Sequence, residues 1–400
     1  MSLAVQTADL DVIGAGFVHL DYAATAPCVR VAADAVQALL PRYGSVHRGA
    51  GPRSQASTLE YERARAVVAT FLGCRPGDQV VFTRNTTDAL NLLARALPPG
   101  TTTVVFDGEH HANLLPWPSV LRLPAPSSPA EAVAAADRAL GDRTGPALLT
   151  VTGASNVTGE VWPLRELAAV AHRHGARIAV DAAQLAPHAP VSLAGLDADY
   201  VALSGHKLYA PFGAGVLAGR ADWLDAAPPY LAGGGASAWV GDRAGDVRWA
   251  TGPARHEGGT PNLLGAVALG AVCAALLETD RAALRAHEQE LLTRLREGVR
   301  RLPGAVEVSL FGTRTAERVG IVSLALPGRD PVAVAARLAD TFGIGVRAGQ
   351  FCAHPLVRRL ASVPGGAGCG EAGLLRVSFG LGTTSDDIDS LLGALGLLLG

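Results

Sequence analysis

The chain has 400 residues, of which 49% are hydrophobic and only 18% charged, and its formal net charge at pH 7 is −2. This composition excludes an intrinsically disordered chain, which would be poor in apolar residues, and the near-neutral charge offers no basic surface for nucleic acid. Because single hydrophobic cores stop growing at about 250–300 residues, we expect two domains.

The termini and the cysteines predict a cytoplasmic protein with no membrane segment. The first 16 residues include Asp9 and Asp11 and lack a basic stretch before an apolar core, so they do not resemble a signal peptide. Apolar runs stay well short of the roughly 18 residues that a membrane-spanning helix needs. The cysteines are scattered and odd in number, which fits neither a disulfide framework nor a Cys-x-x-Cys pair and favours a reducing compartment. They are Cys28, Cys74, Cys273, Cys352 and Cys369.

In chain order, strand-like runs alternate with helical ones over the first half of the sequence. The strand-like runs are 79–82, 103–106, 147–151, 177–180 and 200–203. Amphipathic helical stretches, such as 130–140 and 164–174, lie between them. This alternation predicts an α/β fold with a mainly parallel sheet flanked by helices.

The last third of the chain predicts a second, smaller α/β domain. Helical patterns cover 263–278 and 281–301, and we place the domain change at the break between them. A strand at 319–326, a helix at 331–342, a strand at 374–379 and a final helix follow, with Ser385, Asp386 and Asp387 expected to cap that helix. We therefore expect a large domain of residues 20–278 and a small one of residues 1–19 and 279–400.

Lys207 is the first candidate for chemistry. An apolar strand runs into Ser204-Gly205-His206-Lys207, and a glycine-rich stretch follows. A lysine at the mouth of a buried strand is unfavourable unless it is paired or used covalently, and such amines form Schiff bases with carbonyls, including pyridoxal phosphate. A solvated strand end is the alternative interpretation.

Three other segments agree with a pyridoxal site. Asp181 ends a short apolar strand, where it can pair with a pyridine nitrogen or merely cap a helix. Thr86 and Thr87 begin a helical pattern, which suits either a bound phosphate or simple capping. His110 precedes a second histidine, but no third ligand stands at metal spacing, so a ring stacked on a cofactor is favoured over zinc.

Taken together, these motifs resemble a family. The chain is similar to the group II cysteine desulfurases and selenocysteine lyases of the class V aminotransferase group, which are pyridoxal-phosphate enzymes of fold-type I. The matching stretches follow the family's order and are residues 20–26, 45–49, 84–91, 109–117, 155–159, 180–184, 204–209, 257–262, 347–356 and 375–378.

The resemblance implies a set of residues around pyridoxal 5′-phosphate. They are Thr86, Thr87, His110, Asn156, Asp181, Gln184, Ser204, His206, Lys207 and Thr260. Within this set Lys207 would hold the cofactor covalently, His110 would stack on its ring and Asp181 would pair with its nitrogen. Gln184 would lie near the phenolic oxygen, and Thr87, Ser204 and His206 would hold the phosphate.

The resemblance also implies how substrate and partners are bound. The substrate contacts would be Ala24, His47, Asn156, Arg347 and Arg376, with the guanidinium of Arg376 suited to bidentate binding of a carboxylate. Cys352 would be the nucleophile that forms a persulfide, with His110 and Lys207 as the other catalytic residues. Thr260 would reach the phosphate of a second subunit, which implies a homodimer with shared active sites.

Two departures from the family pattern concern the Cys352 region. Gln350-Phe351 stands before the cysteine where polar or histidine character is expected, which bears on how the thiol is activated. The glycine-rich segment 353–375 is longer than usual. We interpret its Cys369 as an incidental thiol and the Gly-x-Gly-x-x-Gly at 368–373 as a chance match, because a strand follows it instead of preceding it.

The sequence thus predicts a cysteine desulfurase that converts L-cysteine to alanine and passes sulfur from Cys352 to an acceptor, such as a sulfur-acceptor protein. A C–S lyase acting by elimination and a selenocysteine lyase are the alternatives with the same cofactor. An aminotransferase or epimerase would leave Cys352 unexplained. A scaffold without catalysis is disfavoured by the intact set of Lys207, Asp181 and His110.

Overall fold

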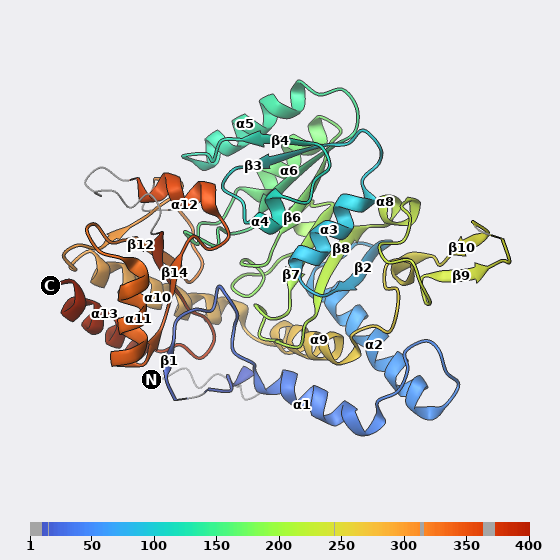
Figure 1. Cartoon of the computed structure of the whole chain (residues 1–400), viewed down its shortest axis with the longest axis horizontal. Helices are drawn as coiled ribbons and strands as arrows, with labels where there is room; N and C mark the ends of the chain where they lie inside the picture. The colour runs from blue at the N-terminus through green and yellow to red at the C-terminus, as the bar shows by residue number, and fades with distance from the viewer. Residues whose placement is uncertain (1–9, 15, 244, 313–315, 363–372) are drawn as a thin grey trace.

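A seven-stranded sheet forms the centre of the molecule in the computed structural model (Figure 1), which describes residues 10–14, 16–243, 245–312, 316–362 and 373–400. Its strands, in spatial order, are β2 (Asp78–Thr83), β8 (Gly215–Arg220), β7 (Tyr200–Ser204), β6 (Arg177–Asp181), β5 (Ala147–Thr152), β3 (Thr102–Phe106) and β4 (Val120–Leu123). Only β8 runs antiparallel to its neighbours within this sheet. The predicted mainly parallel sheet is therefore confirmed.

Both faces of this sheet are covered, because successive residues of each strand point to opposite sides. On β7, Val201 and Leu203 join the core that contains α5 (Pro129–Gly141) and α6 (Leu164–Arg173). Tyr200 and Ala202 join a second core under α3 (Thr86–Ala96) and α8 (Ala221–Ala226). All five residues of β7 are buried, so Ser204, at its end, is held in place by a well-packed strand.

Three long helices pack together beside the sheet. They are α1 (Arg30–Leu39), α2 (Pro52–Phe71) and α9 (Leu263–Glu278). The approach of α9 to α2 is close enough that a Cβ at Gly270 would lie 2.8 Å from the Cβ of Ala64. The predicted helix 263–278 is confirmed at both ends, while the one predicted for 281–301 ends at Val299.

The C-terminal part of the chain builds a four-stranded antiparallel sheet with its own core (Figure 1). Its strands, in spatial order, are β11 (Val306–Glu307), β12 (Ile321–Ala325), β15 (Leu374–Ser378) and β14 (Arg347–Gly349), and its helices are α10 (Arg281–Val299), α11 (Pro331–Phe342) and α13 (Ser385–Leu399). The short β1 (Val18–His19) pairs with β13 (Ile344–Gly345), so these two residues lie with this unit. The boundary predicted at residues 278 and 279 stays a prediction, because the larger core also takes in residues of the C-terminal part.

The remaining elements are short. They are α4 (His111–Leu114), α7 (Leu193–Leu196), α12 (His354–Ala361), the 3₁₀ helices η2 (Leu40–Arg42) and η3 (Gly252–Arg255), and the strands β9 (Ser237–Val240) and β10 (Val247–Trp249). The β9–β10 hairpin projects away from the rest of the molecule in Figure 1. Among the described residues, no single helix is long and apolar enough to span a membrane, and α9 and α10 meet that test only as a pair bent by 92°.

Several local expectations were wrong. Thr384, not Ser385, caps α13, in a capping box with Asp387. Asn85, not Thr86 or Thr87, caps α3 by accepting a hydrogen bond from the Asp88 N–H. Strand β8 lies in the glycine-rich stretch after Lys207, where no strand was predicted.

The glycines of β8 have a steric cause. A Cβ at Gly215 would lie 2.4 Å from the backbone of Asn85, and one at Gly219 would lie 2.1 Å from the carbonyl oxygen of Asp199. A strand at this position therefore needs glycine for close packing. Residues 363–372, with Cys369 and most of the Gly-x-Gly-x-x-Gly stretch, lie outside the described residues, as do residues 1–9.

Candidate active site

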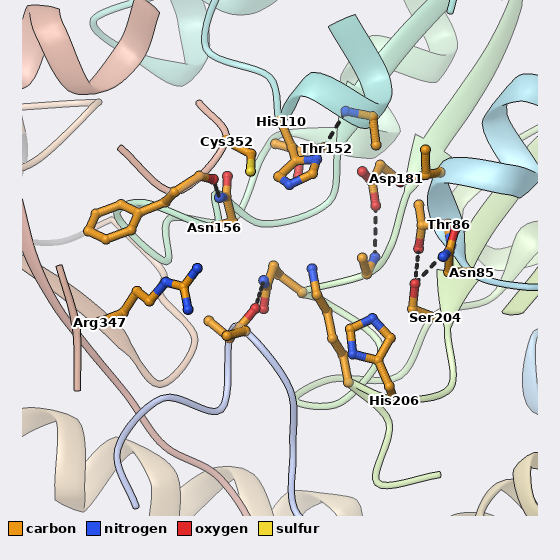
Figure 2. A pocket seen from close by; sticks show the side chains of 18 of the residues that line it. Asn85, Thr86, His110, Thr152, Asn156, Asp181, Ser204, His206, Arg347 and Cys352 are labelled. Atoms are coloured by element: carbon orange, nitrogen blue, oxygen red, sulfur yellow. Dashed lines mark hydrogen bonds between the residues drawn. The ribbon is translucent and has the colours of Figure 1, made fainter. Parts of the chain in front are cut away.

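A cavity of about 260 Å³ opens at the carboxyl ends of β5, β6 and β7 (Figure 2). The last residues of these strands, Thr152, Asp181 and Ser204, line it together with the start of α3. Ligands of α/β proteins bind at this edge of the sheet. The cavity also brings together most of the predicted site residues. They are Ala24, Thr86, Thr87, His110, Asn156, Asp181, Gln184, Ser204, His206, Lys207, Arg347, Cys352 and Arg376.

Lys207 is held at this cavity by a tight turn after β7. A Cβ at Gly205 would lie 2.7 Å from the Ala214 carbonyl oxygen, so the turn requires glycine there. Burial lowers the pKa of Lys207, and the nearby carboxylate of Asp181 offsets part of this effect. The amine is thus biased toward its neutral, nucleophilic form. The sequence contains a further signal for such a role, because Lys207 is the only lysine in the chain.

Asp181 provides a buried acid on the neighbouring strand. Its side chain is held by the Ala183 N–H, which donates to Oδ1 at 3.0 Å. Burial raises the pKa of Asp181, and the positive charge of Lys207 opposes that rise. A carboxylate in these surroundings is stabilised by a cationic partner, such as a protonated ring nitrogen.

The start of α3 offers donors to an anion. The Thr86 N–H donates to Ser204 Oγ at 2.8 Å, and the two hydroxyl oxygens lie 2.7 Å apart. Thr87 is exposed at the cavity wall, and its N–H has no acceptor among the residues that the structure describes. One unpaired N–H among the described residues, at the start of an eleven-residue helix, favours a bound anion. Burial and the charge of Lys207 lower the pKa of His206 to about 4, so this imidazole is neutral.

His110 forms one wall of the cavity as a neutral ring. It caps α4 by accepting a hydrogen bond at Nδ1 from the Ala112 N–H at 3.0 Å, which leaves the proton on Nε2. Burial, and next the positive charge of Lys207, lower its pKa to about 3. A neutral imidazole can lie flat on an aromatic cofactor without charge repulsion.

Sequence reasoning missed Glu109, which lies beneath this wall and is fully buried. Its carboxyl oxygens accept hydrogen bonds at 2.8 Å, one from the Thr152 N–H and the other from the Asn113 side chain. Burial raises its pKa to about 8, although both hydrogen bonds oppose the rise. The carboxyl group thus ties His110's segment to the end of β5. Its signal in the sequence was its place directly before His110.

Two arginines and an asparagine mark the opposite end of the cavity. Arg376 is 3% exposed and donates through Nη2 to Asp21 Oδ1 and through Nη1 to the Asn156 carbonyl oxygen, both at 3.0 Å. Its Nε has no partner among the described residues. Arg347 is exposed and its Nη1 lies 4.0 Å from the other oxygen of Asp21. Asp21, which accepts a hydrogen bond from Arg376, was a second residue without a predicted role.

Cys352 is exposed and lines this cavity (Figure 2). Lys207 lines the same cavity. Its carbonyl oxygen accepts a hydrogen bond from the His111 N–H at 2.8 Å. Gln184, which also lines the cavity, donates to the Ala23 carbonyl oxygen at 2.8 Å. The site therefore combines an amine, a buried acid, the start of a helix and a thiol.

Two predicted residues lie elsewhere in this chain. His47 is exposed and its Nε2 lies 2.9 Å from Glu62 Oε1, in a separate depression with Arg48 and Gly235. Thr260 is also exposed, in a third depression. His47 therefore lies outside the Lys207 cavity of its own chain, and its predicted contact with the substrate stays a prediction. The role of Thr260, which concerns a second subunit, stays a prediction. No cluster of three metal-ligating side chains occurs in the described part of the chain.

Comparisons with known proteins point in one direction. The sequence pattern of the family described as aminotransferase class-V matches residues 18–391. A probable cysteine desulfurase of Vibrio cholerae is 33% identical over 397 residues, covering 96% of this chain and 93% of the relative. A solved cysteine desulfurase structure from Thermococcus onnurineus has a TM-score of 0.87 at 30% identity and covers 100% of this chain and 99% of that one. One from Escherichia coli has a TM-score of 0.84 at 31% identity, with 100% of both chains covered. These similarities confirm the predicted fold class.

Proposed function

Because the chain belongs to the aminotransferase class-V family, we propose that it is a pyridoxal-phosphate-dependent cysteine desulfurase. It would convert L-cysteine to alanine and leave a persulfide on Cys352. The observation that carries this proposal is the shared cavity, which both the Cys352 thiol and the Lys207 amine line. Transfer of an amino group needs no such thiol, whereas removal of sulfur as a persulfide requires one.

The residues of the cavity fit pyridoxal 5′-phosphate. Lys207 offers an amine with lowered pKa for a covalent bond to the aldehyde carbon, and Asp181 offers a buried carboxylate for a protonated pyridine nitrogen. The free N–H of Thr87 and the hydroxyls at the start of α3 suit a phosphate. When bound, pyridoxal phosphate supplies an electron sink for the Cα carbon of an amino acid.

The chain's own residues would bind the substrate and move its proton. The guanidinium of Arg376, with its unpartnered Nε, and the Asn156 amide would bind the carboxylate of L-cysteine. The Lys207 Nζ would then accept the Cα proton. This step needs the neutral amine, which burial of Lys207 favours.

Cys352 would carry out the sulfur step. Its thiolate forms a bond to the substrate sulfur while the Cβ–S bond of the substrate breaks, and the bonding electron pair goes to Cβ. Cβ gains a proton and leaves as part of alanine, so carbon is reduced while the two sulfurs are oxidised to a persulfide. The step therefore needs no external oxidant, and only the thiolate form of Cys352 can perform it.

Three further parts of the proposal concern assembly and location. Thr260 would contact the cofactor phosphate of a second subunit, giving a homodimer with shared sites. The persulfide sulfur would pass from the exposed Cys352 to an acceptor, such as a sulfur-acceptor protein. The cytoplasm is the proposed location, because a reducing compartment keeps thiols free for this chemistry.

Reduction with borohydride tests the cofactor. In protein loaded with pyridoxal phosphate, the reduced cofactor should be found by mass spectrometry on the peptide that contains Lys207. Because the chain has no other lysine, Lys207→Ala should abolish both the adduct and the visible absorbance. A wild-type protein that stays colourless after addition of the cofactor would contradict the cofactor assignment.

Product analysis with L-cysteine tests the reaction. Wild-type protein with a thiol reductant should form alanine, and Cys352→Ala should keep the cofactor spectrum but lose alanine formation. Cys74→Ala is the matched control, because that thiol is partly buried and lies outside the cavity. Pyruvate formed at equal rates by wild type and Cys352→Ala would identify a C–S lyase. Wild-type protein that forms alanine from L-selenocysteine but not from L-cysteine would identify a selenocysteine lyase.

A further inference from the structure

Phe351 and Cys352 form the two central residues of an unusually constrained turn. The Ala353 N–H donates to the Gln350 carbonyl oxygen at 2.9 Å, which closes a four-residue β-turn. Both central residues have positive φ, 50° for Phe351 and 53° for Cys352. Turns of this kind normally carry Asn and Gly at these places, because a Cβ is unfavourable in the left-handed region. The nucleophile therefore sits in a backbone conformation that the surrounding structure has to maintain.

Most of the contacts that maintain this turn conformation are made by Phe351. Its carbonyl oxygen accepts a hydrogen bond from Asn156 Nδ2 at 2.8 Å. Its ring is 9% exposed and lies over the guanidinium of Arg376, with Cζ 4.7 Å from the ring centroid. Cys352 itself is exposed, and its carbonyl oxygen is held by the His111 N–H. Phe351, the residue before the nucleophile, thus contacts both Asn156 and Arg376, the two residues that would bind the substrate carboxylate.

We propose that Phe351 is a positioning residue, whose ring on Arg376 and carbonyl on Asn156 hold the strained turn that presents the Cys352 thiol to the cavity. This inference rests on the proposed function and deepens it. Phenylalanine is suited to this task because its ring face attracts a desolvated guanidinium. Because Arg376 and Asn156 would bind the substrate carboxylate and also contact Phe351, the same residues would fix the positions of the Cys352 thiol and of the substrate sulfur relative to each other.

Phe351→Leu tests this role, because leucine keeps an apolar side chain but removes the aromatic face. We expect kcat for alanine formation from L-cysteine to fall by about tenfold to 100-fold, since misplacement of a reacting group by about 1 Å can cost about 100-fold in rate. In the holoenzyme without substrate, the alkylation rate of Cys352 by iodoacetamide should change severalfold. This rate is followed by mass spectrometry of the Cys352 peptide. The separate variant Phe351→Tyr, which keeps the ring, should have a kcat and an alkylation rate close to those of the wild type.

Phe342→Leu is the matched control. Phe342 is partly buried at the end of α11, in the core of the small sheet, so both readouts should stay at wild-type values. If Phe351→Leu fails to bind the cofactor, Phe351→Met carries the same test with a better match in volume.

Two outcomes would overturn the proposal. In one, the Phe351 variants leave both kcat and the alkylation rate unchanged. In the other, they raise only KM, which would mean that the ring serves Arg376 and not the thiol. A wild-type protein that forms no alanine would refute the proposed function instead, while the alkylation experiment would still report on the turn.

Discussion

Replacement of Arg318 by methionine should strongly destabilise the protein, because it breaks a buried ion pair. Arg318 and Glu160 have side chains 1% and 0% exposed, and Arg318 Nη2 donates to Glu160 Oε1 at 2.9 Å. Arg318 Nη1 also donates to the Thr158 carbonyl oxygen at 2.8 Å. The pair links the loop that carries Asn156 to the segment before β12.

The expected loss of stability depends on the hydrogen bonds that Glu160 keeps when Arg318 is replaced. Removal of one partner of a buried pair costs about 3–5 kcal/mol, because the other charge is left uncompensated. Glu160 would keep donors from the Ser309 hydroxyl and the Leu310 N–H, both at 2.6 Å. We therefore expect a loss near the lower limit, about 3 kcal/mol. Combined with Glu160→Gln, the loss should be smaller than the sum of the two single changes by about 1–3 kcal/mol.

Urea unfolding followed by circular dichroism measures these values, with the slope of the transition compared between variants. Arg294→Met is the control, because Arg294 pairs with Asp389 on the surface and its loss should change stability far less. A loss below about 1 kcal/mol for Arg318→Met would refute the reasoning, since it would mean that the Glu160 charge is neutralised or hydrated in some other way. Strict additivity of the two changes would also contradict a direct interaction.

Three other predictions concern the active site. Asp181→Asn should leave the cofactor bound, as judged by absorbance, but lower alanine formation about 100-fold or more; unchanged turnover would exclude its role at the ring nitrogen. Burial raises the pKa of Glu109 to about 8. Between about pH 4.5 and pH 8, the folded state therefore binds more protons than the unfolded state. Wild-type stability should therefore fall as pH rises toward 8, by up to about 1.4 kcal/mol per unit, and Glu109→Gln should have a flatter profile; equal slopes in urea unfolding would be inconsistent with a buried acid. Lys207→Ala and Thr260→Ala proteins should recover activity when their subunits are exchanged, whereas a fully active monomer would rule out shared sites.

Much of the fold was determined by local patterns in the sequence. Runs of apolar residues predicted five of the seven strands of the large sheet, namely β2, β3, β5, β6 and β7. A break after Glu278 predicted where α9 ends. These signals are local because burial on both faces of a strand requires continuous apolar residues. The position of Lys207 near a strand end was predicted by a local pattern too, because the Ser-Gly-His-Lys motif begins where the buried apolar run ends.

Other features depended on contacts between distant residues, which no local pattern encodes. Asp21 contacts Arg376 although the two residues are 355 positions apart in the sequence. The buried strand β8 was not among the predicted strands. Backbone conformation at Phe351 and Cys352 is a further case, because neither residue type favours positive φ. Only the tertiary structure supplies the Asn156 and Arg376 contacts that hold them there. The sequence by itself thus determined which elements form and which residues could react, while packing decided how those residues are oriented, because orientation depends on neighbours that the chain brings together only when it folds.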